Sequence, residues 1–197
     1  MLLIFYISNF LQAKLLGNNN CCLNKNIFMG DVKNLTADDA VEKIREIAKD
    51  ANICMFVTDL SNLPLAGRPM ATQEVDEQGN IWFMSDRNSD KNKHIENDDQ
   101  VQLFYSHTNN YEYLSVFGKA EIVNDRSKIS ELWTPMAKTW FKEGKDDPNI
   151  SLIKVIPVDA YYWDTKNNKM VSLIKFAMGA VGLSPKDDGG VEGKLKV

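Results

Sequence analysis

The sequence lacks the two glycine-rich signatures by which many proteins hold a phosphate. No G-x-G-x-x-G opens a helix after an apolar run, and no G-x-x-x-x-G-K-[ST] occurs along the 197 residues. Both signatures work because the backbone N–H groups of a turn or helix start surround the phosphate oxygens. Any phosphate-bearing ligand of this chain must therefore be held by side chains.

Cysteine, histidine and clustered positive charge are also scarce. The cysteines are the adjacent pair Cys21 and Cys22 and the distant Cys54, so no spaced disulfide framework exists and a reducing, cytoplasmic location is expected. The only histidines, His94 and His107, have no ligand partners at metal-binding spacing, so we expect no metal site. The net charge of −4, without a polybasic arm, argues against nucleic acid as a partner.

Residues 1–28 differ in composition from the rest of the chain. Their apolar run lacks the basic start and small-residue cleavage site of a secretory signal, and it is too short before Gln12 and Lys14 to span a membrane. We favour a third interpretation, a non-core extension upstream of a conventional opening at Met29. No stable membrane association is expected.

Hydrophobic periodicity predicts one domain over residues 29–180, followed by a flexible tail over 181–197. A helix is expected from about residue 36 to 50, with Thr36 as its cap, Asp39 completing a capping box, and an apolar face that includes Ile44. Further helices are predicted over 91–97, 126–142 and 170–182, and strands over 53–60, 69–75, 81–85, 101–108, 113–123 and 151–164.

Three residues refine this outline. Pro135 should kink or interrupt the helix expected over 126–142. Gly118 indicates a bulge or a close backbone approach within its strand, and Pro157 should occupy an edge or bulge position. Short strands separated by short turns are typical of a barrel or a compact sheet.

One segment offers side chains suited to a phosphate. Ser85 ends a predicted strand, Ser89 and Lys91 follow it, and Arg68 begins the neighbouring strand. A phosphate monoester needs cations together with hydroxyl or backbone donors, and the arginine fork can bind two of its oxygens. Because serine and lysine are common in loops, spacing alone still favours a solvated turn.

The segment RPMATQEVDEQGNIWFMSDRNSDKNKHIENDDQVQLFY resembles the core of the pyridoxamine 5′-phosphate oxidase-like split barrels, which bind flavin mononucleotide (FMN). The segments LWTPMAKTWFKEGKDDPN and AYYWD are similar to the general stress protein branch of that family. The resemblance extends from about Thr36 to Met178. It implies a mainly β (α+β) fold, namely a six-stranded Greek-key split β-barrel with flanking helices.

The resemblance also implies FMN as the cofactor and a homodimer with the flavin at the subunit interface. Tyr113 and Trp163 are then expected to reach the flavin of the partner subunit, whereas Trp133 and Trp140 are expected mainly to pack a helix on the barrel. Within one subunit, the implied cofactor contacts are Arg68, Met70, Thr72, Ser85, Ser89 and Lys91.

The chain departs from true pyridoxamine phosphate oxidases. Gln73 stands where they carry a basic residue for the substrate phosphate, and no Arg-x-His ending follows Trp163. We therefore do not expect vitamin B6 oxidation, and no catalytic residue is assigned. Three functions stay open: a flavin oxidoreductase with a small-molecule redox partner, a non-catalytic flavin-binding or redox-sensing stress protein, and a haem-binding split barrel.

Overall fold

Six antiparallel strands close into a barrel in the computed structural model, which describes residues 31–165 and 190–196. The ring runs β3, β4, β5, β8, β7, β6 and back to β3, as the resemblance implied. Strands β6 and β7 alternate buried and more exposed residues, because one face lines the barrel interior, whereas β5 and the start of β8 are buried on both faces. Their bounds are β3 Ile53–Thr58, β4 Ala66–Val75, β5 Ile81–Asp86, β6 Gln100–His107, β7 Glu112–Val123 and β8 Ile150–Thr165.

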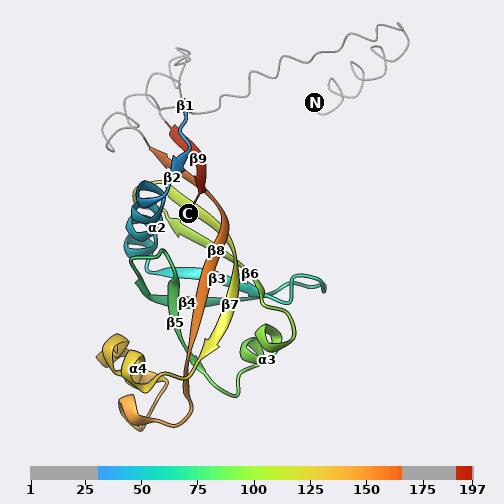
Figure 1. The fold of residues 1–197 in the computed structure, drawn as a ribbon, viewed down its shortest axis with the longest axis vertical. Coiled ribbons are helices and arrows are strands. Elements are labelled where there is room, and N and C mark those ends of the chain that lie inside the picture. Colours follow the sequence, from blue (N-terminus) through green and yellow to red (C-terminus); the bar gives the residue numbers. More distant parts are fainter. Residues whose placement is uncertain (1–30, 166–189, 197) are drawn as a thin grey trace, which may run out of the picture.

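The longest strand, β8, runs the length of the barrel (Figure 1). Its start pairs with β5 and its end with β9 (Gly190–Lys196), while β7 pairs along most of it. The β7–β8 register shifts between Phe117 and Gly118, and Gly118 faces Pro157 there. A Cβ added at Gly118 would lie 2.6 Å from the Ile156 carbonyl oxygen, which confirms the predicted close backbone approach and bulge.

Helix α2 (Asp38–Ala51) covers one end of the barrel and buries the apolar face predicted for it, Ile44 included. Its predicted capping by Thr36 and Asp39 is wrong. Thr36 belongs to β2 (Leu35–Thr36) and pairs with Lys196 of β9, and the residue before the helix is Ala37, without a side-chain cap. Thr36 does not cap the helix because its backbone is held in a strand pairing, and the local sequence does not reveal that pairing.

The prediction of a flexible tail over 181–197 is wrong for residues 190–196. These form β9, which is antiparallel to the end of β8 and parallel to β1 (Asp31–Val32) and β2. Gly193 permits this arrangement, because a Cβ there would lie 2.0 Å from the Lys33 carbonyl oxygen. The expected extension over 1–28 and the expected helix over 170–182 lie outside the described residues.

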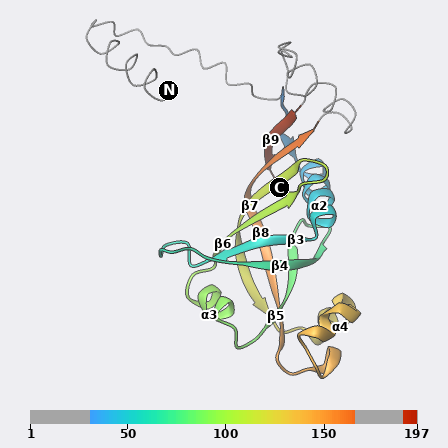
Figure 2. The same ribbon diagram turned by 180° about the vertical axis from the view of Figure 1, so that it is seen from behind.

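A second layer covers the other end of the barrel (Figures 1 and 2). It comprises α3 (Asp90–Asn97), α4 (Arg126–Leu132) and the short 3-10 turns η1 (Pro135–Thr139) and η2 (Gly144–Asp146). The helix predicted over 126–142 is interrupted at Pro135, as expected. No helix within 31–165 and 190–196 is long and apolar enough to cross a membrane.

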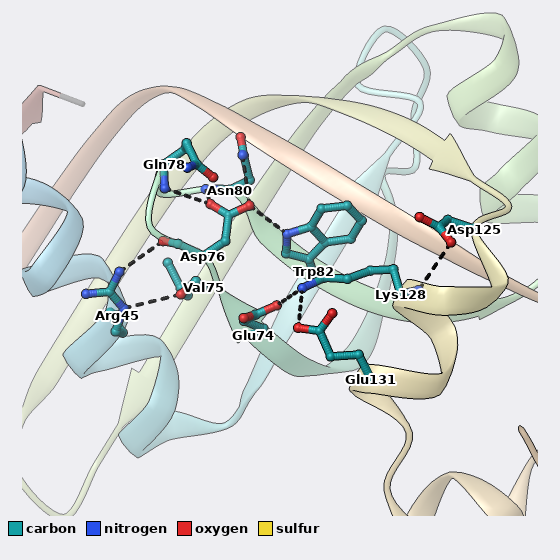
Figure 3. Close-up of polar contacts among 10 residues, drawn as sticks. All are labelled: Arg45, Glu74, Val75, Asp76, Gln78, Asn80, Trp82, Asp125, Lys128 and Glu131. Atoms are coloured by element: carbon teal, nitrogen blue, oxygen red, sulfur yellow. Dashed lines mark hydrogen bonds and ion pairs between the residues drawn. The ribbon is translucent and has the colours of Figure 1, made fainter.

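The turn between β4 and β5 is fastened by Asp76 (Figure 3). The Asp76 carboxylate accepts hydrogen bonds from the indole N–H of Trp82, at 2.9 Å, and from the backbone and side chain of Asn80. The Arg45 guanidinium of α2 donates to the carbonyls of Val75 and Asp76. This turn therefore ties α2 to the β4–β5 hairpin.

Helix α4 is tied to the same hairpin by an ion pair (Figure 3). The Lys128 ammonium lies 2.6 Å from the Glu74 carboxylate of β4 and 2.9 Å from Glu131, and it also lies over the Trp82 ring. Because η1 follows α4 directly, this contact helps to fix the position of η1 against β4. Strand β4 also carries Arg68, so the same contacts position the walls of a pocket.

Candidate functional site

A cavity of about 380 Å³ lies between β4, β5, the start of α3 and the segment around η1. Its volume falls in the range of small-molecule sites. Four of the predicted cofactor residues, Arg68, Met70, Ser85 and Lys91, line it. The remaining lining residues are Pro69, Ala71, Gln73, Met84, Asp86, Thr134, Met136, Ala137, Trp140 and Phe141.

Two cations face this cavity, and both are half-buried. Burial lowers the pKa of Lys91, and the nearby charge of Arg68 lowers it further, while Asp86 partly offsets both effects. Burial likewise lowers the pKa of Arg68, and Asp90 opposes this effect. Lys91 forms no ion pair with any residue in 31–165 or 190–196. Two positive groups that repel each other in a cavity favour an anion between them.

A short chain of hydrogen bonds holds Arg68. Its guanidinium donates to the Thr58 hydroxyl at 2.7 Å, and that hydroxyl lies 3.0 Å from Nδ1 of His94. Thr58 is fully buried at the end of β3, and His94 comes from α3. The contact fixes the arginine side chain relative to the helix that supplies Lys91.

Ser85 and Ser89 belong to a buried polar network. The Ser85 hydroxyl donates to the Asn92 side-chain carbonyl at 2.6 Å and lies 3.3 Å from the Ser89 hydroxyl. The Asn92 amide donates in turn to Ser151 at 2.9 Å. Ser85 is only 2% exposed, so its side chain anchors the start of α3 to β5 and β8. The network thereby sets the position of Lys91 in the first turn of the helix.

The rest of the wall is apolar and rich in methionine and aromatic groups. Met70 and Met84 come from the two strands, whereas Met136, Trp140 and Phe141 come from the segment after α4. Such a wall suits a flat, polarizable ring system. The expectation that Trp140 mainly packs a helix on the barrel is wrong. It is 68% exposed and lines the cavity, because the chain turns after η1 and carries the indole outward.

The other four predicted contacts do not line this cavity. Thr72 shares a hydrogen bond of 2.7 Å with the buried hydroxyl of Tyr105. Tyr113 and Trp163 are paired across β7 and β8, near the end of β8, whereas Ser85 pairs with Ser151 near its start. Ser89 supports the cavity through Ser85 without lining it. The predicted reach of Tyr113 and Trp163 concerns a partner subunit and stays a prediction.

Sequence reasoning missed several lining residues. Asp86 lines the cavity from the end of β5, next to Ser85, whereas Thr134, Met136 and Phe141 reach it only because α4 and η1 are placed against β5. Nothing in their local pattern distinguishes them from surface or packing residues. The run LWTPMAKTWF gives a partial indication that Met136 is available to a ligand. Pro135 interrupts the helix there, so Met136 does not pack on a helix face and its side chain is exposed.

An exposed apolar face continues from the cavity around the barrel. Pro69 of the cavity wall is paired with Met55, and Met55 is paired with Phe104 of β6. Residues directly opposite in a sheet project from the same face. Met55 and Phe104 are 47% and 48% exposed, and Ile53 beside them is also exposed. Contiguous apolar surface of this kind is typical of an interaction site.

Residues 39–187 match the model of the family described as "Pyridoxamine 5′-phosphate oxidase like". Among curated proteins, the chain is similar to Protein bli-3 of Neurospora crassa, with 25% identity over 130 residues. That alignment covers 61% of this chain and 62% of the Neurospora protein.

Solved structures share the fold. The crystal structure described as a general stress protein 26 from Jannaschia sp. CCS1 aligns with a TM-score of 0.68 and 22% identity, over 82% of this chain and all of that one. The general stress FMN/FAD binding protein from Xanthomonas citri aligns with a TM-score of 0.58 and 22% identity, over 67% of this chain and 93% of that one. At this identity the likeness shows a common fold.

Proposed function

Given that the chain belongs to the pyridoxamine 5′-phosphate oxidase-like family, we propose that it binds FMN in the cavity lined by Arg68, Ser85 and Lys91 and acts as a flavin-dependent oxidoreductase. The chain spans less than two thirds of the length of the Neurospora relative, so a whole-protein activity is not transferred from it. Support comes from the site itself and from the flavin binding ascribed to the Xanthomonas protein. We also propose a cytoplasmic location, because the cysteines of the sequence form no spaced disulfide framework.

The observation that carries the proposal is the pair of half-buried cations facing one cavity. A phosphate with nearly two negative charges would relieve the repulsion between Arg68 and Lys91. It would also raise the pKa of Lys91 back toward its ordinary value. Arg68 is held ready by Thr58, so little side-chain freedom is lost on binding. The Ser85 hydroxyl is engaged with Asn92, so its contribution is to hold the helix start rather than to donate to the ligand.

The apolar wall fits the other end of the cofactor. A flavin ring needs a flat apolar surface, which Met70, Met84 and Trp140 offer. When bound, a flavin supplies the electron transfer, and the protein supplies binding, orientation and access. Gln73 lies in the cavity lining where a substrate phosphate would need a cation, which argues against pyridoxamine phosphate as the substrate.

Removing either cation should weaken FMN binding. We expect Arg68→Ala and Lys91→Ala each to raise the Kd by about 10- to 150-fold, which corresponds to about 1.5–3 kcal/mol for a charge-assisted contact. The measurement is quenching of flavin fluorescence on titration of FMN with the purified protein. Lys93→Ala is the matched control, because Lys93 lies on the same helix, is exposed and pairs with Asp90. Wild-type affinity in both test variants would overturn the proposed site.

Turnover separates the two flavin functions. An oxidoreductase loaded with FMN should oxidise a reduced nicotinamide in the presence of an electron acceptor, and Lys91→Ala should lower the rate at limiting FMN. Tight FMN binding with no turnover across a panel of donors and acceptors would instead support a storage or sensing role. One observation favours this second function. The titratable side chains that line the described cavity are Arg68, Asp86 and Lys91, and the two cations among them are assigned to the phosphate, which leaves Asp86 alone for proton transfer.

We further propose that two subunits pair through the apolar face formed by Ile53, Met55 and Phe104 (the β3–β6 face). This face borders the cavity through Pro69, so a second subunit placed there would cover the open side of the site. Met55→Asp should therefore convert a dimer to a monomer and weaken FMN binding, because a buried carboxylate at an interface is costly. Light scattering after size-exclusion chromatography measures the first effect.

Lys145→Gln is the control for the change in net charge, because it alters the charge by the same one unit at an exposed residue, and it should leave the dimer intact. A Met55→Asp protein that stays dimeric would place the subunit contact elsewhere. A monomer with unchanged FMN affinity would show that one subunit binds the cofactor alone.

A further inference from the structure

Three possible metal ligands meet at the end of the barrel covered by α2. Asp50 comes from the last turn of α2, His107 ends β6, and Glu112 begins β7. One ligand atom from each residue lies within 4.8 Å of the other two, and Nδ1 of His107 is 3.1 Å from the Glu112 carboxylate. The FMN cavity lies toward the other end of β8, so the two sites are separate.

The cluster brings two carboxylates together, and one of them is buried. The Glu112 side chain is only 9% exposed, and burying a carboxylate is costly unless a positive charge or several donors compensate it. Its hydrogen-bond partner is the imidazole of His107. Asp50 adds a second carboxylate at the C-terminal end of a helix, where the backbone dipole is already negative. A cation bound between these groups would compensate both carboxylates.

The donor set identifies the kind of cation. One imidazole and two carboxylates are ligands of first-row divalent metals, and among Mn²⁺, Fe²⁺ and Zn²⁺ the usual order of affinity favours Zn²⁺. Ligands about 2.0–2.2 Å from a tetrahedral zinc lie about 3.2–3.6 Å apart. The observed separations allow that geometry after small side-chain rotations. We propose that Asp50, His107 and Glu112 form a Zn²⁺ site with water in the fourth position.

Such a site would fasten α2 to the hairpin formed by β6 and β7. These elements are distant in sequence, which explains why ligand spacing along the chain indicated no metal site. A metal that binds the folded state alone stabilises that state. The proposal concerns stability and does not depend on flavin binding.

Cobalt provides the direct test. The full chain, freed of metal with a chelator, should develop visible Co²⁺ absorption bands that saturate at one equivalent and disappear when Zn²⁺ is added. His107→Ala should abolish the bands. His94→Ala is the matched control, because His94 is the other of the chain's two histidines and faces Thr58 instead, and it should keep them.

Asp50→Asn provides a variant with little risk of misfolding, since Asp50 is exposed. It should weaken Co²⁺ binding on the order of 10-fold or more, the loss found when even an outer partner of a metal ligand is removed. Zinc at about 100 times its Kd should raise the Tm of the wild-type protein by about 5–10 °C, and by less in Asp50→Asn.

Three results would overturn the proposal. One is the absence of saturable Co²⁺ or Zn²⁺ binding to the wild-type chain. Another is a Co²⁺ spectrum that persists in a folded His107→Ala protein, as judged by circular dichroism. The third is a thiolate charge-transfer band in the near ultraviolet, which would assign the metal to cysteine. In each case the cluster would be a hydrogen-bonded group only.

Discussion

The two apolar clusters of this protein differ in what they contribute. The larger fills the barrel beneath α2 and takes residues from all six barrel strands. The smaller lies between the outside of β5 and β8 and the segment from α4 to Phe141. Ala137 and Phe141 belong to the smaller cluster and also line the cavity proposed to bind FMN. Stability should therefore depend mainly on the first cluster, and ligand affinity on the second.

The largest expected effect is a truncation inside the larger cluster. Phe83 is fully buried and meets Phe56 edge to face at 5.1 Å between ring centroids. Phe83→Ala should lower the free energy of unfolding by about 3–5 kcal/mol, because a large cavity forms in a closed barrel. Urea denaturation followed by circular dichroism measures this. Leu63→Ala, at a residue that is 86% exposed, should change stability by at most about 0.5 kcal/mol.

A smaller effect is expected at the junction of the two clusters. Asp76→Ala leaves the indole N–H of Trp82 without its acceptor and should cost about 1–3 kcal/mol. Burial opposes ionisation of Asp76, but hydrogen bonds from Trp82 and Asn80 outweigh it, so the pKa of the carboxyl lies below its ordinary 3.8. The Asp76 carboxylate therefore makes its full contribution to the free energy of unfolding near neutral pH, and this contribution is lost as the pH falls through the lowered pKa.

The pH dependence gives a direct check of that prediction. The difference in unfolding free energy between the wild-type protein and Asp76→Ala should be constant from pH 7 to about 5 and should narrow below about pH 4. A difference that grows on acidification would contradict this account of Asp76.

The smallest expected change in stability is at Trp140. Since its side chain is largely exposed, Trp140→Ala should alter the free energy of unfolding by at most about 0.5 kcal/mol. The same substitution should raise the Kd for FMN by about 5- to 10-fold, because an aromatic contact of about 1 kcal/mol is lost. Trp133→Ala is the comparison, since Trp133 packs on the smaller cluster without lining the cavity. Equal FMN affinities in the two variants would assign Trp140 no role in binding.

The barrel strands could be predicted because their signals are local. Strand β6 alternates apolar and polar residues, and the break at Pro135 results from its missing N–H group. Strand β9 could not be predicted, because its glycine-rich and charged segment becomes a strand only by pairing with β8. The same holds for Thr36, whose strand pairing displaced the expected helix cap.

The candidate site likewise combines residues that the sequence predicts with contacts that it does not predict. Arg68 and Lys91 could be proposed from residue types and from the family resemblance, and both face the cavity. The bond from Arg68 to Thr58, and the outward turn of Trp140, depend on contacts between separate elements. Local sequence carries no record of such contacts, so geometry was needed to find them.

The pairing of β8 has a consequence for synthesis of the chain on the ribosome. Until residues 150–165 emerge, β5 and β7 each lack the neighbour that β8 provides, and both present an unpaired edge. Such edges pair readily with other chains. Nascent chains that stall before Ile150 should therefore aggregate or recruit chaperones, whereas those that stall after Thr165 has emerged can close the ring.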